Sequence, residues 1–192
     1  MPELPEVETT KRGIEPYISN QSIKKILVRN NKLRIPFNKK LAKEITNIEI
    51  SDIKRRAKYI IVDFANGYSI VIHLGMTGNL RVSKKIKYLK HDHIIFYLSS
   101  GNVLIYNDVR RFGLIQIYRT NESFFLLDNN GPDPFEKEAN ANYLFNKIKK
   151  STASIKSLLL NHKVISGIGN IYASEILFAT NISPTRKGKD VS

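Results

Sequence analysis

Hydrophobic residues in the first two thirds of the chain recur in short runs rich in Ile, Val, Phe and Tyr, a pattern typical of β-strands. Turn sequences separate these runs, and the clearest hairpin signals are Asn66-Gly67 and Ser100-Gly101-Asn102. Seven short strands with little helix between them predict a sandwich or a barrel. The predicted strands are Ile23–Val28, Ile48–Ile53, Tyr59–Phe64, Tyr68–Leu74, His93–Leu98, Val103–Tyr106 and Leu114–Tyr118.

The pattern is helical at both ends of the chain. Pro5 suits the first turn of a helix, and Glu6 and Glu8 favour the positive end of its dipole. Gly13 and Pro16 predict where this first helix closes. The later segments are helices at Asn140–Lys150, Ile155–Leu160 and Asn170–Thr180, followed by a polar tail at Thr185–Ser192 that we expect to be frayed.

A polar stretch containing Gly and Pro, NNGPDP (129–134), separates the β pattern from the later helices. Such composition is typical of a linker. The sequence therefore predicts an α+β protein. Residues 1–128 form a basic β domain behind the N-terminal helix, residues 129–134 are the linker, and residues 135–192 form a small helical domain.

Composition narrows the classes of protein that fit. The chain has 192 residues, of which 42% are hydrophobic and 25% charged, as in globular proteins that bury a core. It has no Cys, which excludes a disulfide scaffold, a Cys-ligated zinc site and a catalytic thiol. Neither a transmembrane run of about 18 apolar residues nor a secretory signal pattern is present. We expect a cytoplasmic protein with no membrane partner.

Charge is unevenly distributed along the chain. The formal net charge is +14, and residues 9–96 alone hold 19 basic and 6 acidic side chains, a net of +13. A surplus of this size on folded sequence favours a polyanionic partner such as nucleic acid over a merely soluble basic surface.

The first six residues, MPELPE, have the composition of an amine-based active site. Met before a small residue is normally removed, which exposes the secondary amine of Pro2. An α-amino group has a pKa near 8, so a useful fraction is uncharged and can attack an aldehydic carbon to form a Schiff base. Glu3 can transfer protons there, and Glu6 can orient the same site. The alternative is that these residues only begin a helix.

Several stretches together carry a resemblance to one family. They are PELPEVETTKRGIEPYI (2–18), RRAKYIIV (55–62), HLGMTGNL (73–80), KHDHI (90–94), NDVRRFG (107–113), NNGPDP (129–134) and GIGNIYASEILF (167–178). In this order they resemble the formamidopyrimidine-DNA glycosylases, also called 8-oxoguanine DNA glycosylase/AP lyases, over nearly the whole chain. The resemblance implies an N-terminal helix with a two-layer antiparallel β-sandwich, followed by part of a helix–two-turn–helix domain.

The resemblance also implies a base-excision-repair activity on oxidised purines in duplex DNA. Pro2 would attack C1′ of the damaged nucleotide and expel the base, with Glu3 as its acid/base partner. Lys58 matches a family lysine that assists β-elimination at the abasic site. Without the family, the run that contains Lys58 would be read as a solvated charge cluster at a strand edge.

An enzyme that acts on a base must extrude it from the stack, so side chains must fill the gap. The family's three gap-filling residues match Met76, Arg110 and Phe112, with Arg111 beside them. His91 matches a DNA contact, and the amides that precede Asn170 predict a phosphate site at a helix N-terminus. Glu175 lies in the same match as a supporting residue.

The sequence departs from the family in three places. Members carry a C-terminal zinc finger with four Cys and a lesion-contacting Arg, and this chain, which reads as truncated at Ser192, has no Cys. We therefore expect no zinc and no other cofactor, and loss of the δ-elimination step. Val109 replaces a usual Pro, and a basic phosphate contact falls on Ser151, next to Lys150.

Three functions remain open at this point. The first is a bifunctional glycosylase/AP lyase that acts as a monomer on damaged double-stranded DNA in the bacterial nucleoid. The second is a truncated, non-catalytic DNA-binding remnant of the family. The third is a basic RNA-binding β protein, which leaves the series of motifs unexplained.

Overall fold

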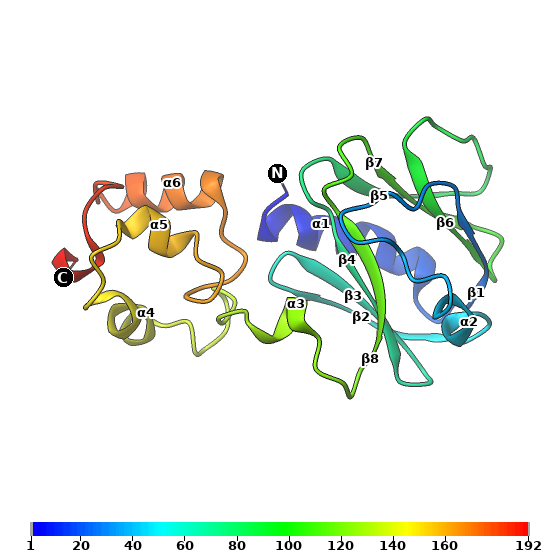
Figure 1. Cartoon of the computed structure of the whole chain (residues 1–192), viewed down its shortest axis with the longest axis horizontal. Coiled ribbons are helices and arrows are strands. Elements are labelled where there is room, and N and C mark those ends of the chain that lie inside the picture. The colour runs from blue at the N-terminus through cyan, green and yellow to red at the C-terminus, as the bar shows by residue number, and fades with distance from the viewer. Residues whose placement is uncertain (1, 192) are drawn as a thin grey trace. The chain divides into compact units, whose positions relative to one another are not determined.

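The computed structural model describes residues 2–191, which divide into two compact units (Figure 1). The first unit extends to Ser123 and the second begins at Phe124. The boundary predicted from the sequence lies slightly later, at the end of the short helix α3 (Phe125–Asp128). Within residues 2–191, no helix has the length and apolar character needed to cross a membrane.

The first unit contains two four-stranded antiparallel sheets and an N-terminal helix, α1 (Leu4–Ile18). One sheet has the order β1-β6-β7-β5 and the other β2-β3-β4-β8. Helix α1 packs against β2, β3 and β5, so it contacts both sheets. The strands are β1 (Ile23–Val28), β2 (Ile50–Arg56), β3 (Tyr59–Phe64), β4 (Tyr68–His73), β5 (Gly78–Ser83), β6 (Asp92–Leu98), β7 (Val103–Asp108) and β8 (Leu114–Arg119).

Alternation along the strands distributes apolar residues to the two faces of each sheet. Ile94 and Phe96 of β6 belong to the main core, together with residues of α1 and of the other sheet. Ile95, between them, forms a second small cluster with Val103 and Ile105 of β7. All three are buried, so the β1-β6-β7-β5 sheet is covered on both faces.

Strand β5 was not predicted from the sequence. Its residues, GNLRVS, include Gly and Asn, which disfavour strands, and they are mostly half-buried because β5 is an edge strand that pairs only with β7. The short helix α2 (Ala42–Ile45) was also missed, since four residues give no helical period.

Helix α1 continues past the predicted stop at Gly13 and Pro16. Its last turn is held by Ile14 and Ile18, which lie four residues apart on one face and are both buried. Pro16 is tolerated there, and the helix ends at the C-cap Ser19, whose N–H donates to the carbonyl of Glu15. Burial of that face outweighs the local breakers.

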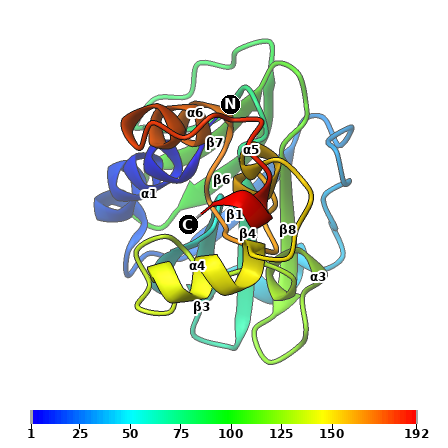
Figure 2. The same ribbon diagram turned by 90° about the vertical axis from the view of Figure 1, so that its left-hand side faces the viewer.

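The second unit is helical (Figure 1, Figure 2). Besides α3 it contains α4 (Ala141–Ile148), α5 (Ile155–Leu159), α6 (Asn170–Ala179) and the 3₁₀ turn η1 (Gly188–Asp190). The N-cap residue of α4 is Asn140 and that of α5 is Ser154, and the side chains of both accept a hydrogen bond from a backbone N–H of the first turn.

Two segments of the second unit are more ordered than the sequence predicted. In the expected linker, the N–H of Gly131 donates to the carbonyl of His162, and Ser166 donates to the buried Asp133 carboxylate at 2.7 Å. In the tail, the N–H of Gly188 donates to Ala153 and Val191 packs on the helical core. The prediction of a frayed tail is wrong through Val191, while Ser192 lies outside the described residues.

Candidate active site

The N-terminus of α1 forms an acidic corner. Glu3 is the N-cap residue and is buried, with 1% of its surface exposed. It forms a capping box with Glu6: the Glu3 side chain accepts the N–H of Glu6, and the Glu6 carboxylate accepts the N–H of Glu3 at 2.9 Å. Pro2, immediately before it, is half-buried. Met1, whose removal we predict, lies outside the described residues.

Lys58 lies in the tight turn between β2 and β3. The turn is made by Ala57, whose φ of 53° is unusual for a residue with a side chain, and by Lys58 itself. Burial lowers the pKa of Lys58 below its ordinary value, while the charges of Glu3 and Glu6 raise it in opposition. The lysine therefore shares one electrostatic environment with the acidic corner.

A chain of ion pairs ties α1 to this turn. Glu8 of α1 accepts from Arg55 of β2 at 3.0 Å and from Arg12 at 2.7 Å. The guanidinium of Arg55 also donates to the carbonyl of Ala57 at 3.0 Å. Arg55 is mostly buried, so the Glu8 pair fixes the distance between the helix that carries Glu3 and the turn that carries Lys58.

Two loops of the first unit are held together by one buried carboxylate. Asp108, at the end of β7, accepts from Thr77 Oγ1 at 2.5 Å, from the N–H of Gly113 at 2.9 Å and from the hydroxyl of Tyr106 at 3.2 Å. Thr77 in turn accepts from the N–H of Arg110 at 3.0 Å. The loop at 74–78 and the loop at 109–113 are therefore one rigid unit.

The glycines of these loops permit their close approach. A side chain on Gly75, which has φ of +61°, would meet the backbone of Phe112 and Gly113. A side chain on Gly113 would overlap the hydroxyl of Tyr106. Only glycine fits where the two backbones touch.

The tips of the two loops carry the predicted gap-filling residues, and they are exposed. Met76 is 39% exposed and Phe112 48% exposed, although both are large and apolar. The guanidinium of Arg110 lies over the Phe112 ring, 4.6 Å from its centroid. Arg111 has φ of 59°, which turns the backbone between them. The structure thus presents two apolar side chains and a cation from one anchored pair of loops.

His73 is a residue that sequence reasoning did not single out. It ends β4 and pairs with Tyr59, the residue after Lys58, so their rings lie 4.9 Å apart. Burial and the nearby cations Arg34 and Lys58 lower the pKa of His73 to about 4, although the charge of Asp108 acts to raise it. Its Nδ1 accepts from the N–H of Gly75 at 3.0 Å, so the neutral ring carries its proton on Nε2.

Periodicity could not have found His73, because in the sequence it reads as one more residue of the strand Tyr68–Leu74. Only the β3–β4 register brings it to the Lys58 turn.

His91 lies just before β6 and is half-buried. Its carbonyl accepts the N–H of Asp108, which places it beside the paired loops. The next histidine, His93, is buried and donates from Nε2 to the carbonyl of Asp108 at 2.6 Å. Both histidines therefore support the segment that leads to Arg110.

The second unit places its predicted residues as follows. Gly167, with φ of 82°, and the buried Ser166 lead into α6, whose N-cap is Gly169. Asn170 is the first helical residue and is exposed, and Gly169 takes the N-cap position. Its side chain can face a ligand at the helix N-terminus. Lys150 and Glu175 are exposed.

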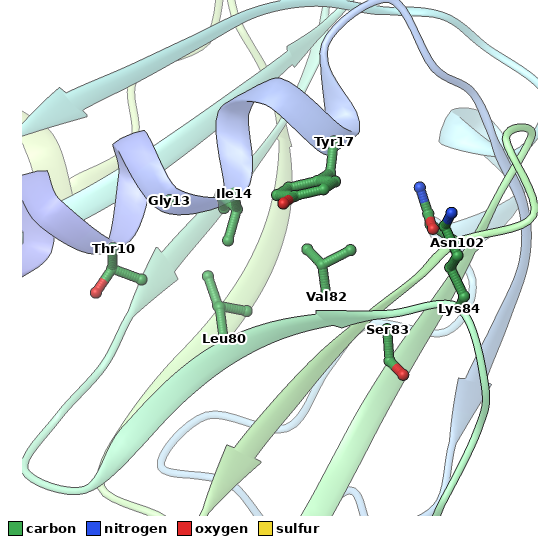
Figure 3. Close-up of a pocket in the computed structure, with 9 residues that line it drawn as sticks. All are labelled: Thr10, Gly13, Ile14, Tyr17, Leu80, Val82, Ser83, Lys84 and Asn102. Atoms are coloured by element: carbon green, nitrogen blue, oxygen red, sulfur yellow. The ribbon is translucent and has the colours of Figure 1, made fainter.

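One groove of the first unit lies apart from these residues. A groove of about 390 Å³ lies between α1 and β5 and is lined by Ile14, Tyr17, Leu80 and Val82, among others (Figure 3). It includes none of the predicted site residues. The zinc site of the family does not fit the described residues, since the chain has no Cys and no three His, Asp or Glu side chains within 2–191 converge.

Comparison with known proteins decides the family. The sequence model of the formamidopyrimidine-DNA glycosylase N-terminal domain matches residues 1–115, and that of the formamidopyrimidine-DNA glycosylase H2TH domain matches residues 130–192. The chain belongs to the formamidopyrimidine-DNA glycosylase family. The family inferred from the motifs is confirmed, and with it DNA repair by base excision as the general function.

Similar proteins support the same conclusion. The formamidopyrimidine-DNA glycosylase of Hydrogenovibrio crunogenus is 43% identical over 194 residues, and the match covers all of this chain and 69% of the relative. The formamidopyrimidine-DNA glycosylase of Rickettsia peacockii is also 43% identical, and the match covers 71% of that relative.

Solved structures agree in fold. The Lactococcus lactis Fpg in complex with abasic-site DNA superposes with a TM-score of 0.91 at 33% identity, over 99% of this chain and 71% of that one. A complex of the LlFpg protein with THF-DNA and an inhibitor gives 0.92 at 33% identity, over 100% of this chain and 72% of that one. The predicted fold class, a helix with two antiparallel sheets followed by helices, is confirmed.

Proposed function

We propose that this chain is a bifunctional DNA glycosylase and AP lyase that removes oxidised purines from duplex DNA through a Schiff base on Pro2. The observation that carries the proposal is the meeting of three groups at the start of α1. These are Pro2, which becomes N-terminal when Met1 is removed, the buried Glu3 carboxylate, and Lys58, whose pKa is lowered by burial. An amine, an acid/base and a partly desolvated lysine are the groups that such chemistry needs.

The first half of the reaction replaces the base by the protein. The Pro2 nitrogen, freed by removal of Met1, attacks C1′ of the damaged nucleotide. The N-glycosidic bond breaks, and its electron pair leaves with the base, which takes up the proton that the Pro2 nitrogen gives up as it bonds to C1′. Glu3 supplies a proton to the ring oxygen of the sugar as the ring opens, which leaves an iminium between Pro2 and C1′.

The second half breaks the strand. The iminium acidifies the protons on C2′, and removal of one of them expels the 3′ phosphate by β-elimination. Lys58, uncharged in a greater fraction than an exposed lysine, is suited to move that proton or, when charged, to hold the departing phosphate. Water then hydrolyses the iminium and releases Pro2.

The exposed loop tips are suited to the extrusion of the damaged nucleotide, which precedes the chemical reaction. Extruding a nucleotide costs a few kcal/mol of stacking, and apolar side chains inserted into the gap compensate for it. We assign this role to Met76 and Phe112, and pairing with the orphaned base to Arg110, whose guanidinium lies over the Phe112 ring. His91, Arg111, Lys150 and Asn170 are proposed as phosphate contacts.

Covalent trapping tests the proposal. The purified chain, with Met1 removal verified by mass spectrometry, is incubated with borohydride and duplex DNA carrying 8-oxoguanine opposite cytosine. We expect a stable protein–DNA adduct. A matched control carries an N-terminal extension that keeps Pro2 in a peptide bond, and it should give none.

Absence of the adduct from the processed chain would reject the catalytic proposal. Salt-dependent DNA binding without adduct or strand cleavage would instead support a non-catalytic DNA-binding member of the family. Equal affinity for undamaged RNA would support the RNA-binding alternative.

A further inference from the structure

A basic surface lies beside the proposed site and has no part in the chemistry described above. We call it the basic strip and define it by Lys25, Arg29, Lys84, Lys85, Lys87 and Lys90. All six residues are exposed. Four of them fall within the seven residues 84–90, which contain no acidic side chain.

The topology places this strip along the outer face of one sheet. Ser83, at the end of β5, pairs with the first residue of β7, whereas Asp92, at the start of β6, pairs near the last. Residues 84–91 therefore return along the full length of β7, which is roughly 20 Å at 3.3 Å per residue. The segment ends at His91, beside the loop of Arg110.

The strip is built on an ordered scaffold. Asp92 is buried and accepts from both guanidinium nitrogens of Arg81 at 2.6 Å, and from the N–H of Leu89 at 2.8 Å. These bonds hold the pKa of Asp92 near 2 despite its burial. Arg29 donates to the carbonyl of Leu89 at 2.9 Å, which ties the end of β1 to the same segment.

Two tyrosines space the cations of the strip. The Arg29 guanidinium lies 4.7 Å from the ring centroid of Tyr88, and the Lys25 ammonium 5.7 Å from that of Tyr97. The two tyrosine hydroxyls are hydrogen-bonded at 3.1 Å. Tyr97 also packs on the small apolar cluster of β6 and β7. Aromatic anchoring limits the conformations of Arg29 and Lys25 and keeps their charges on the surface.

Several cations elsewhere in the first unit are paired with carboxylates. Arg55 and Arg12 pair with Glu8, and Lys54 with Asp63. Within residues 2–191, no carboxylate lies within ion-pair distance of any of the six cations of the strip. A concentrated, uncompensated charge on a rigid scaffold is suited to a polyanion rather than to fold stability.

We propose that the basic strip binds the phosphate backbone of duplex DNA that flanks the lesion, in continuity with His91. The proposal rests on the proposed function for the identity of the partner. Roughly 20 Å corresponds to the rise of about six base pairs of duplex at about 3.4 Å each. These contacts carry no sequence information, and they strengthen binding on either damaged or undamaged duplex.

The salt dependence of DNA binding tests this assignment. We compare K85Q/K87Q/K90Q with K39Q/K40Q/K43Q, which removes the same charge from exposed positions near α2. Each lost phosphate contact lowers the slope of log Kobs against log salt by about 0.9. The strip variant should lose about 2–3 from the slope of the wild-type chain on undamaged duplex, and the control less than about 1. K85R/K87R/K90R, which keeps the charge, should retain the slope.

Two results would overturn the assignment. One is an equal change of slope in the strip variant and in its control, which would mean a general effect of net charge. The other is loss of slope on duplex RNA with none on duplex DNA. Adduct formation reports separately on the chemistry: a normal adduct with an unchanged slope rejects only the strip, and a missing adduct with the expected slope change rejects only the catalytic proposal.

Discussion

The acidic corner at α1 and the paired loops at the end of β7 are built in opposite ways. At the corner, Glu3 is buried and Lys58 is half-buried, and their backbone segments are held by partly buried ion pairs such as Glu8 with Arg55. In the loops, the holding carboxylate of Asp108 is buried while the tips, Met76 and Phe112, are exposed. A group that exchanges protons benefits from desolvation, whereas a group that must enter another molecule has to be exposed and rigidly based.

Substitution of Glu3 should separate chemistry from structure at the corner. Glu3→Gln keeps an oxygen that accepts the N–H of Glu6, so the helix cap persists. It removes the acid/base group, and excision of 8-oxoguanine should fall by about 10²–10⁴-fold in single-turnover kinetics. Trapping on DNA that already contains an abasic site should persist, because no base has to leave.

The exposed Glu44→Gln serves as the matched control and should excise at the wild-type rate. An equal loss of base excision and abasic-site trapping in Glu3→Gln, with the fold intact, would contradict the assigned role.

We expect Asp108 to be the residue that holds the two loops together. Asp108→Ala leaves the N–H of Gly113 and the hydroxyls of Thr77 and Tyr106 without their acceptor, two of them buried. The free energy of unfolding should fall by about 3–4 kcal/mol in urea titrations. The exposed Asp52→Asn should change it by less than about 1 kcal/mol. If both variants are equally stable, the loops are not held by Asp108.

The two regions also differ in what the sequence could predict. Most strands were found because buried Ile, Val and Phe alternate or run together, as in Tyr59–Phe64, which is identical in prediction and structure. Pro2, Glu3 and Lys58 are proposed from the chemistry of their side chains and from family motifs. The edge strand β5 was missed because pairing with β7, rather than its own composition, makes it a strand.

The supporting residues of the site were missed for a related reason. Strand register brings His73 to the turn that contains Lys58, and a hydrogen bond joins Asp108 to Thr77. Neither relation leaves a local pattern in the chain. Likewise, Gly169 rather than Asn170 occupies the N-cap because the backbone conformation of the loop decides that position. Side-chain type predicted the reacting groups, and tertiary pairing determined the groups that hold them.

Lowering the pH should destabilise the fold through protonation of His73, which lies between the acidic corner and the paired loops. Its folded pKa is about 4, below the unfolded value of 6.5, so the unfolded chain binds more protons between these pH values. Stability should therefore fall as pH decreases from 6.5 to 4, by roughly 3 kcal/mol at most. Thermal unfolding across this range checks the slope, which should flatten in His73→Phe. The exposed His162→Gln should keep the wild-type slope, and a slope unaffected by His73→Phe would exclude this histidine as its source.

The smallest expected effect is the most informative test of the contrast between the loop tips and the acidic corner, because it separates function from stability within one loop. Phe112→Ala removes a side chain that is 48% exposed, so the free energy of unfolding should change by no more than about 0.5 kcal/mol. Excision should nevertheless slow by about tenfold, or about 1.4 kcal/mol, because the gap left by the extruded base is less well filled. Val109→Ala, at a position 54% exposed on the same loop, is the matched control and should alter neither quantity. A drop in stability with normal excision would mean that Phe112 belongs to the scaffold, and the tips and the corner would then be built alike.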